Sequence, residues 1–348
     1  MPQLVEVFLR RYFSPGECVY DPFSGSGTTL VEANVFGCDA IGCDISAFNC
    51  LLARVKVAEH SLPALELALR GTLEQARRGS AHESDASQWL RTWYSPGALA
   101  DLLAYREAAD ALGEADRDVA KVVLSRAARS ARLTTHFDLD FPKRPIHEPY
   151  HCYKHKRTCR PVGEAAKFLR RYTADTCARL RAFAEQRRPA RRAVVLHDDA
   201  RTVVLPERPS GIITSPPYPG LIDYHEQHRY AYELLRLDDR RQEEIGPAAR
   251  GTSRRALSRY VDEMSAAFAN AARQLPADAP VLIVVNDSRD LYAEVLRRSG
   301  LLLEERITRH VNRRTGRRAG EFFEDVLVCR TRGTDAPARD LAPRSAER

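Results

Sequence analysis

The chain has 348 residues, of which 44% are hydrophobic and 29% charged, and its formal net charge is +7. This composition indicates a globular protein, and no apolar run approaches the roughly 20 residues that a membrane span needs. Charged residues interrupt the N-terminal segment and no small-residue cleavage site follows it, so we expect a cytoplasmic protein without a membrane partner. Eight scattered cysteines in a chain of this length indicate reduced thiols rather than disulfides.

Residues 18–44 predict a β-strand, a helix and a second strand. The first strand leads into the sequence DPFSGSGTT, in which Gly25 and Gly27 permit a tight turn before a helix that Gly37 closes. A second buried strand is expected at 39–44. Because the backbone amides at the start of the helix face the turn, we expect this corner to bind a ligand.

Acidic residues at the strand ends indicate which ligand this is. Asp21 would repel a phosphate but would pair with a positively charged amino group, and Asp44 is placed to accept hydrogen bonds from ribose hydroxyls. One of Asp198 and Asp199, which end a third predicted strand at 193–196, can accept a bond from an adenine amine. The alternative for this pair is a solvated turn or a helix cap. These groups together match S-adenosylmethionine.

The strand predicted at 210–214 runs into Ser215-Pro216-Pro217-Tyr218. The prolines restrict the backbone, so the loop is rigid before a substrate arrives. The Ser215 hydroxyl and the Pro216 carbonyl can accept hydrogen bonds from both N–H groups of a base amine, and these bonds localise the nitrogen lone pair. Tyr218 can stack on an extruded base. The alternative is a plain proline turn. No cysteine follows a proline, which argues against methylation at a ring carbon through a cysteine nucleophile.

The remaining pattern divides the chain into a sheet domain and an insertion. Alanine, leucine, arginine and glutamate recur at helical spacing in 58–192, and 134–161 is predicted to be a long loop within this block. Further strands are expected at 281–285 and in a hairpin that turns at Thr315-Gly316. The predicted division is therefore a sheet domain at 1–57 and 193–330, a helical insertion at 58–192, and a disordered tail at 331–348.

The predicted loop carries basic and aromatic residues, and the insertion is the natural candidate for target recognition. We expect phosphate or guanine contacts from Arg144, Lys154, Lys156, Arg157 and Arg160, although a solvated basic face is the alternative for any one of them. Spacings that can ligate zinc also occur, in His151, Cys152, His155, Cys159 and Cys177. A regular paired Cys-x-x-Cys pattern is absent, so no metal site is predicted.

The DPFSGSGT and Ser-Pro-Pro-Tyr motifs together resemble the amino-methylating DNA methyltransferases of restriction-modification type, in particular the branch that modifies cytosine N4. This resemblance covers both terminal blocks. It implies an α/β fold with a Rossmann-like class I S-adenosylmethionine-dependent sheet, double-stranded DNA as substrate with base flipping, and a possible partner restriction endonuclease. The expected cofactor site consists of Asp21, Pro22, Phe23, Gly25, Gly27, Thr28, Asp44, Asp198 and Asp199, and the catalytic site of Ser215, Pro216, Pro217 and Tyr218.

The chain also departs from the common arrangement of this family, in which the catalytic motif precedes the glycine motif. The reversed order implies a circular permutation, so the recognition element does not transfer by analogy. Adenine N6 and RNA guanine N2 methylation are the enzymatic alternatives, and those enzymes more often carry Asp or Asn where this chain has Ser215. A catalytically inactive DNA-binding subunit is the alternative from another class.

Overall fold

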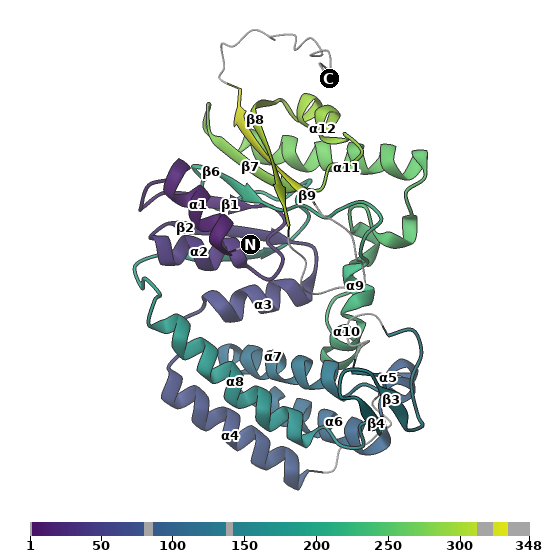
Figure 1. Cartoon of the computed structure of the whole chain (residues 1–348). Coiled ribbons are helices and arrows are strands. Elements are labelled where there is room, and N and C mark those ends of the chain that lie inside the picture. The colour runs from purple at the N-terminus through teal and green to yellow at the C-terminus, as the bar shows by residue number, and fades with distance from the viewer. Residues whose placement is uncertain (1, 80–85, 137–141, 312–322, 333–348) are drawn as a thin grey trace.

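The computed structural model describes residues 2–79, 86–136, 142–311 and 323–332 as an α/β layer above a group of helices (Figure 1). The strands of the large sheet are β1 (Cys18–Asp21), β2 (Asp39–Asp44), β5 (Ala193–His197), β6 (Gly211–Thr214), β7 (Pro280–Val285), β8 (Leu301–His310) and β9 (Phe323–Thr331). The helices that flank them are α1 (Pro2–Tyr12), α2 (Thr28–Phe36), α3 (Ala47–Val57), α11 (Arg254–Arg273) and α12 (Tyr292–Ser299).

The sheet has the strand order β5-β2-β1-β6-β7-β9-β8, and β9 is antiparallel to both of its neighbours. Numbered along the chain among these seven strands alone, the order is 3-2-1-4-5-7-6. This arrangement confirms the expected Rossmann-like class I methyltransferase sheet. The predicted turn at Thr315-Gly316 and residues 333–348 of the predicted tail lie outside the described residues.

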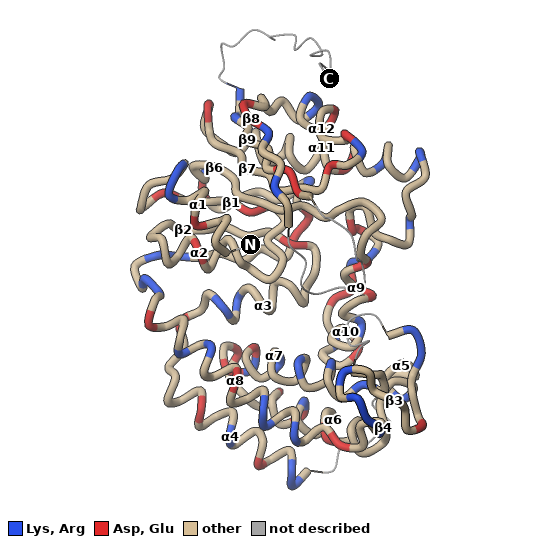
Figure 2. Tube along the Cα trace, viewed as in Figure 1, with Lys and Arg blue, Asp and Glu red and all other residues tan. Residues whose placement is uncertain are grey.

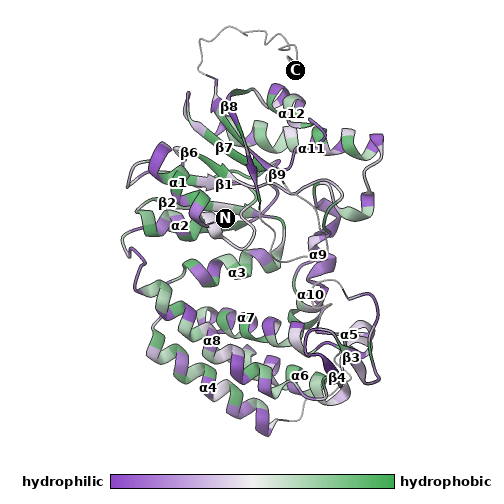
Figure 3. Cartoon of the chain, in the orientation of Figure 1, coloured by the Kyte–Doolittle hydropathy of each residue, from purple (hydrophilic) through white to green (hydrophobic). Residues whose placement is uncertain are grey.

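Alternate strand residues serve the two faces of the sheet, as the twofold period of a strand requires. Val19 and Ile213 pack in the core under α1 and α2, whereas their neighbours Tyr20 and Ile212 pack in the core under α11 and α12. Helices therefore cover both faces, and the strands between them are the most hydrophobic part of this layer (Figure 3).

The segment between α3 and β5 folds mainly as helices, with a core of their own. These are α4 (Leu62–Arg78), α5 (Gln88–Trp93), α6 (Pro96–Asp110), α7 (Glu114–Ala131) and α8 (Ala166–Ala184). Phe48 and Leu51 of α3 and Tyr230 and Leu234 of α10 (Arg229–Leu235) join the same core, so α3 and α10 connect the helices to the sheet domain. None of the described helices is long and apolar enough to cross a membrane.

The predicted long loop at 134–161 contains a small antiparallel hairpin, which corrects the sequence analysis. Its strands are β3 (Tyr150–Cys152) and β4 (Arg157–Cys159), with Cys152 opposite Arg157. Each strand has only three residues, of which only the cysteine is buried, so no alternating apolar pattern marks the hairpin in the sequence.

Gly27 offers a test of the turn that precedes α2. Its φ is +81°, and an added Cβ would lie 2.9 Å from the Cβ of Ala53. We therefore expect Gly27→Ala to lower the free energy of unfolding by more than about 1 kcal/mol. Gly71→Ala is the matched control, because Gly71 lies inside α4 in open space and should gain up to about 1 kcal/mol. Urea unfolding of both variants measures this, and equal effects of the two substitutions would contradict it.

Candidate cofactor and catalytic site

The glycine turn presents its backbone to a pocket at the carboxyl ends of the central strands. Gly25 has a φ of +50°, nothing lies within 4 Å of the place where its Cβ would be, and the residue lines the pocket. Gly42 of β2 permits the turn to lie close to the sheet, because a Cβ there would be 2.9 Å from the Ser24 side chain. The turn is therefore held against β2 while its exposed side is open to a ligand.

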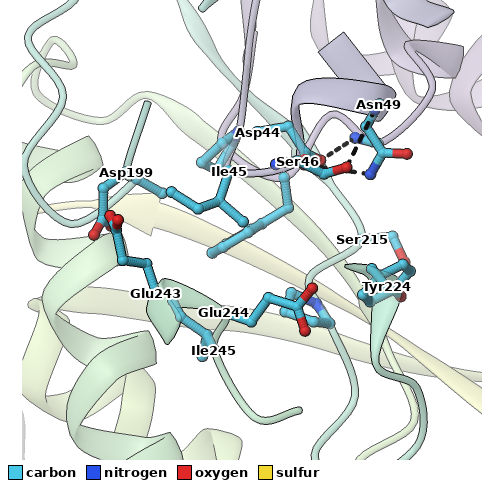
Figure 4. Close-up of a pocket in the computed structure, with 15 residues that line it drawn as sticks. Asp44, Ile45, Ser46, Asn49, Asp199, Ser215, Tyr224, Glu243, Glu244 and Ile245 are labelled. Atoms are coloured by element: carbon cyan, nitrogen blue, oxygen red, sulfur yellow. Dashed lines mark hydrogen bonds between the residues drawn. The ribbon is translucent and has the colours of Figure 1, made fainter. Parts of the chain in front are cut away.

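Asp44 ends β2 and lines the same pocket. Its carboxylate accepts hydrogen bonds from the amides of Gly25 and Ser46, both at 2.8 Å, and from the Asn49 side chain at 3.3 Å (Figure 4). Burial raises the pKa of Asp44, although these donors act to lower it. The three donors fix the orientation of the carboxylate and leave acceptor capacity for a ligand, since each oxygen has two lone pairs.

Asp21 lies behind the pocket wall rather than on it. The side chain is 4% exposed, and its Oδ1 accepts from the Phe23 amide at 3.1 Å and from the Thr214 hydroxyl at 2.7 Å. Burial raises the pKa of Asp21 to about 6, against the opposing hydrogen bond from Thr29. The structure thus gives Asp21 partners within the protein, and pairing with a ligand amine stays a prediction.

Asp198 and Asp199 follow β5 and differ in their surroundings. Asp199 lines the pocket, and its carboxylate is paired with Arg201, the shortest contact being 2.6 Å. Burial acts to raise the pKa of Asp199, but the hydrogen bonds from Arg201 outweigh it and hold the pKa below its usual range. Asp198 does not line the pocket and instead accepts from the Asp199 amide at 2.7 Å. Only Asp199 is therefore placed beside a ligand.

The Ser-Pro-Pro-Tyr loop reaches the pocket through Ser215 and Pro217. Tyr260 of α11 supports the loop by donating its hydroxyl to the Pro217 carbonyl at 2.9 Å. The Tyr218 hydroxyl donates to Glu324 of β9 at 3.2 Å and its ring packs against the core under α11, so its stacking on a base stays a prediction. Tyr218 does not line the pocket.

Sequence reasoning missed eight of the residues that line this pocket. The cavity has a volume of about 140 Å³ and opens to solvent at its mouth. Tyr224 lies beside Ser215 at one end, and Glu243 lies beside Asp199 at the other (Figure 4). For Tyr224, the one indication in the sequence was that it is an aromatic residue soon after the catalytic motif. The residues missed are Ile45, Ser46, Asn49, Ala200, Tyr224, Glu243, Glu244 and Ile245. Pro22, Phe23 and Gly25 line the pocket, whereas Gly27 and Thr28 form the turn and helix start behind it.

The predicted DNA-binding residues are all exposed and lie on or beside the β3–β4 hairpin, where basic side chains gather (Figure 2). A second hollow separates this part of the molecule from the catalytic loop. It is lined by Trp89 and Trp93 of α5 on one side and by Leu221, Ile222 and Gln227 on the other. The two tryptophan rings are stacked, with centroids 5.6 Å apart. Aromatic side chains of α5 thus line this second hollow.

Comparison with known proteins gives the following matches. A family model described as DNA methylase matches residues 2–54. The type II methyltransferase M.MjaII of Methanocaldococcus jannaschii is 35% identical over 411 residues, covering 94% of this chain and 77% of that protein. Among solved structures, TrmN from Thermus thermophilus has 14% identity and a TM-score of 0.36, covering 95% of this chain and 48% of TrmN. A SAM-dependent methyltransferase from Methanosarcina mazei has 8% identity and a TM-score of 0.37, covering 93% and 97%.

The strand order, together with a glycine turn and a strand-end carboxylate at one pocket, defines a class I methyltransferase that uses S-adenosylmethionine. This confirms the cofactor expected from the sequence. The extended match at 35% identity shows the family: the chain belongs to the N6/N4 DNA methylases and is a DNA methyltransferase.

Asp44→Ala should weaken the binding of S-adenosylmethionine by roughly 10- to 100-fold, because hydrogen bonds to a charged acceptor contribute about 1.5 to 3 kcal/mol. Titration calorimetry measures this affinity. Asp198→Ala is the matched control, since this neighbouring carboxylate does not line the pocket and its removal should change the affinity little. Equal losses of affinity in both variants would contradict a specific role of Asp44 in binding the cofactor.

Asp21→Asn should change how stability depends on pH. The folded-state pKa of about 6 lies above the ordinary value, so the folded state holds the proton more tightly, and the wild type loses stability as pH rises from about 4 to about 6. Asparagine does not titrate, so the variant should gain up to about 3 kcal/mol relative to the wild type over that window. Urea unfolding at several pH values tests this, and a difference that stays constant with pH would contradict it.

Proposed function

We propose that this chain methylates the exocyclic N4 amine of cytosine in double-stranded DNA, as the methyltransferase of a type II restriction-modification system. The observation that carries the proposal is the position of Ser215, which lines the pocket that Asp44 and the glycine turn also line. The reacting loop and the methyl donor would then share one cavity. M.MjaII, which carries the name type II methyltransferase, supports the assignment to such a system.

The reaction requires little covalent chemistry from the protein. The amine of cytosine is a poor nucleophile because its lone pair is delocalised into the ring, and acceptors aimed at its protons localise that pair. In this scheme the Ser215 hydroxyl oxygen accepts a hydrogen bond from one N–H of the amine and the Pro216 carbonyl oxygen accepts a hydrogen bond from the other. S-adenosylmethionine supplies an electrophilic methyl group, and holding nitrogen, methyl carbon and sulfur in line supplies much of the rate.

Tyr224 is the ring that we assign to stacking on the extruded base, in place of Tyr218. It lines the pocket next to Ser215, whereas Tyr218 is anchored by its hydroxyl on Glu324, which itself pairs with Arg309. Burial raises the pKa of Tyr224 to about 12, so its hydroxyl stays protonated at neutral pH. An uncharged ring is what stacking on a base requires.

We further propose that the insertion reads the target sequence. The second hollow brings Trp89 and Trp93 of the insertion together with Leu221 and Gln227, which follow the catalytic loop. Exposed arginine and lysine side chains on the hairpin would meet phosphates, and planar guanidinium groups can also read guanine edges. This division leaves the sheet domain to bind the cofactor and the insertion to choose the site.

The test is to express the chain in a methylation-free host and to sequence its DNA by a method that distinguishes modified bases. N4-methylcytosine in one sequence context is expected. N6-methyladenine would overturn the cytosine assignment, and unmodified DNA from a folded chain that binds S-adenosylmethionine would favour an inactive DNA-binding subunit. Methylated RNA guanine would place the substrate in another class.

Ser215→Ala should lower methyl transfer by roughly 100-fold or more without weakening DNA binding, because the acceptor acts mainly as the amine becomes pyramidal. Tyr224→Ala should also destabilise the extruded base by about 1 to 3 kcal/mol, which a fluorescent base analogue reports. Tyr218→Ala is the matched comparison and should leave extrusion closer to wild type. If Tyr218→Ala abolishes extrusion and Tyr224→Ala does not, our assignment of the stacking ring is wrong.

A further inference from the structure

Two cysteines and two histidines converge at the base of the β3–β4 hairpin, well apart from the pocket described above. Cys152 ends β3, His155 lies in the turn, Cys159 ends β4, and His136 follows α7. One ligand atom from each of these four side chains lies within 4.8 Å of every other. The Cys152 sulfur is 3.5 Å from His136 Nδ1 and 3.6 Å from His155 Nδ1, and the Cys159 sulfur is 3.5 Å from His155 Nδ1.

These distances are those of the edges of a zinc tetrahedron. Zinc lies about 2.3 Å from a thiolate and about 2.0 to 2.1 Å from an imidazole nitrogen, so sulfur and nitrogen ligands of one ion are about 3.5 to 3.6 Å apart. All three measured sulfur–nitrogen distances agree with this value. We propose that His136, Cys152, His155 and Cys159 bind a structural Zn²⁺ ion.

Hydrogen bonding among the same groups explains the geometry less well. His155 Nδ1 faces the sulfurs of both Cys152 and Cys159, but one ring nitrogen either carries a single proton or accepts one. A single cation between the four groups satisfies all three of these sulfur–nitrogen contacts at once. The Tyr150 hydroxyl, 3.0 Å from His136 Nδ1, would give up that contact when the nitrogen binds the ion.

The hairpin itself is short and buries few side chains, so backbone pairing and apolar burial contribute little to its stability. Its two strands have three residues each, and the ring of Tyr153 at its turn is 81% exposed, whereas the Cys152 and Cys159 side chains are 3% and 8% exposed. So small a unit has little apolar surface to bury, and such units are commonly held together by a metal. Four protein ligands leave no open coordination position, so the ion has a structural role.

The consequence is that the metal fixes the hairpin to the end of α7 through His136. Lys154, Lys156 and Arg157 extend from this hairpin into solvent. The ion would hold these cations in one arrangement, which the proposed reading of DNA requires. The metal site itself rests on geometry alone and does not depend on the proposed function.

Metal analysis of the purified, untagged chain tests the proposal. About one equivalent of zinc per chain is expected, and Cys152→Ser and His155→Ala should lose it. His151→Ala and Cys177→Ser are the matched controls and should keep the metal. His151 is exposed and packs on Tyr153, with ring centroids 5.1 Å apart, and Cys177 lies in the core of the helices, so neither belongs to the cluster.

Cobalt substitution gives a readout that does not depend on stability or activity. The zinc-free chain titrated with Co²⁺ should gain thiolate-to-cobalt charge-transfer absorption together with the intense visible bands of a tetrahedral site. His155→Cys should keep a metal and strengthen the charge-transfer absorption, since it adds a third thiolate. Binding of S-adenosylmethionine by each variant shows that its sheet domain is folded.

Three results would overturn the site: a folded chain without zinc that gains no thiolate absorption with Co²⁺, a Cys152–Cys159 disulfide in freshly purified protein, or equal metal loss in the control variants. A failure of DNA methylation with intact metal binding would instead count against the proposed function and leave the zinc site standing.

Discussion

The hydrogen bond between Asp21 and Thr214 joins the two loops on which the site depends. Asp21 ends β1 and begins the glycine motif, and Thr214 ends β6 and directly precedes the Ser-Pro-Pro-Tyr loop. The strands are adjacent and parallel, so their carboxyl ends lie side by side, and the 2.7 Å bond between these side chains is buried. A buried carboxylate that loses a partner costs several kcal/mol, so the loops keep a fixed separation. The pocket between Gly25 and Ser215 has its width because of this constraint.

The parts of the fold that the sequence predicted are those with local causes. The strand at 39–44 has the predicted bounds, because a run of buried residues between Gly37 and a strand-end acid leaves little choice of register. The glycine turn was predictable because glycine adopts positive φ values, such as the +81° of Gly27, more readily than any other residue. Asp44 could be placed at the pocket for the same kind of reason, since carboxyl ends of parallel strands meet at one edge of a sheet.

The parts that were missed depend on contacts between distant residues. Tyr218 and Tyr224 both follow the catalytic strand, and nothing in their order tells which one faces the pocket. Their directions are decided by Glu324, which holds the Tyr218 hydroxyl from a strand more than 100 residues further along the chain. His136 was missed likewise, because it lies outside the closely spaced histidines and cysteines of the hairpin and reaches them only through the fold.

The position of the insertion follows from the direction of the strands. α3 begins at the carboxyl end of β2 and therefore ends near the amino ends of the strands. β5 begins at that same edge of the sheet. The insertion therefore leaves the sheet domain and returns to it on the side opposite the pocket. A 3.1 Å hydrogen bond between Arg187 and Glu59 closes this junction. α4 and α8, with 17 and 19 residues, are about 26 and 28 Å long, whereas a strand of five or six residues spans about 17 to 20 Å. The far ends of the two helices lie together beside α6. α10, which comes after the catalytic loop in the chain, packs instead on α5, α6 and α7. A buried hydrogen bond of 2.8 Å joins the hydroxyls of Tyr232 of α10 and Ser46, beside Asp44. Tyr232 also packs in the core of the helices, so this one residue connects the insertion to the wall of the pocket.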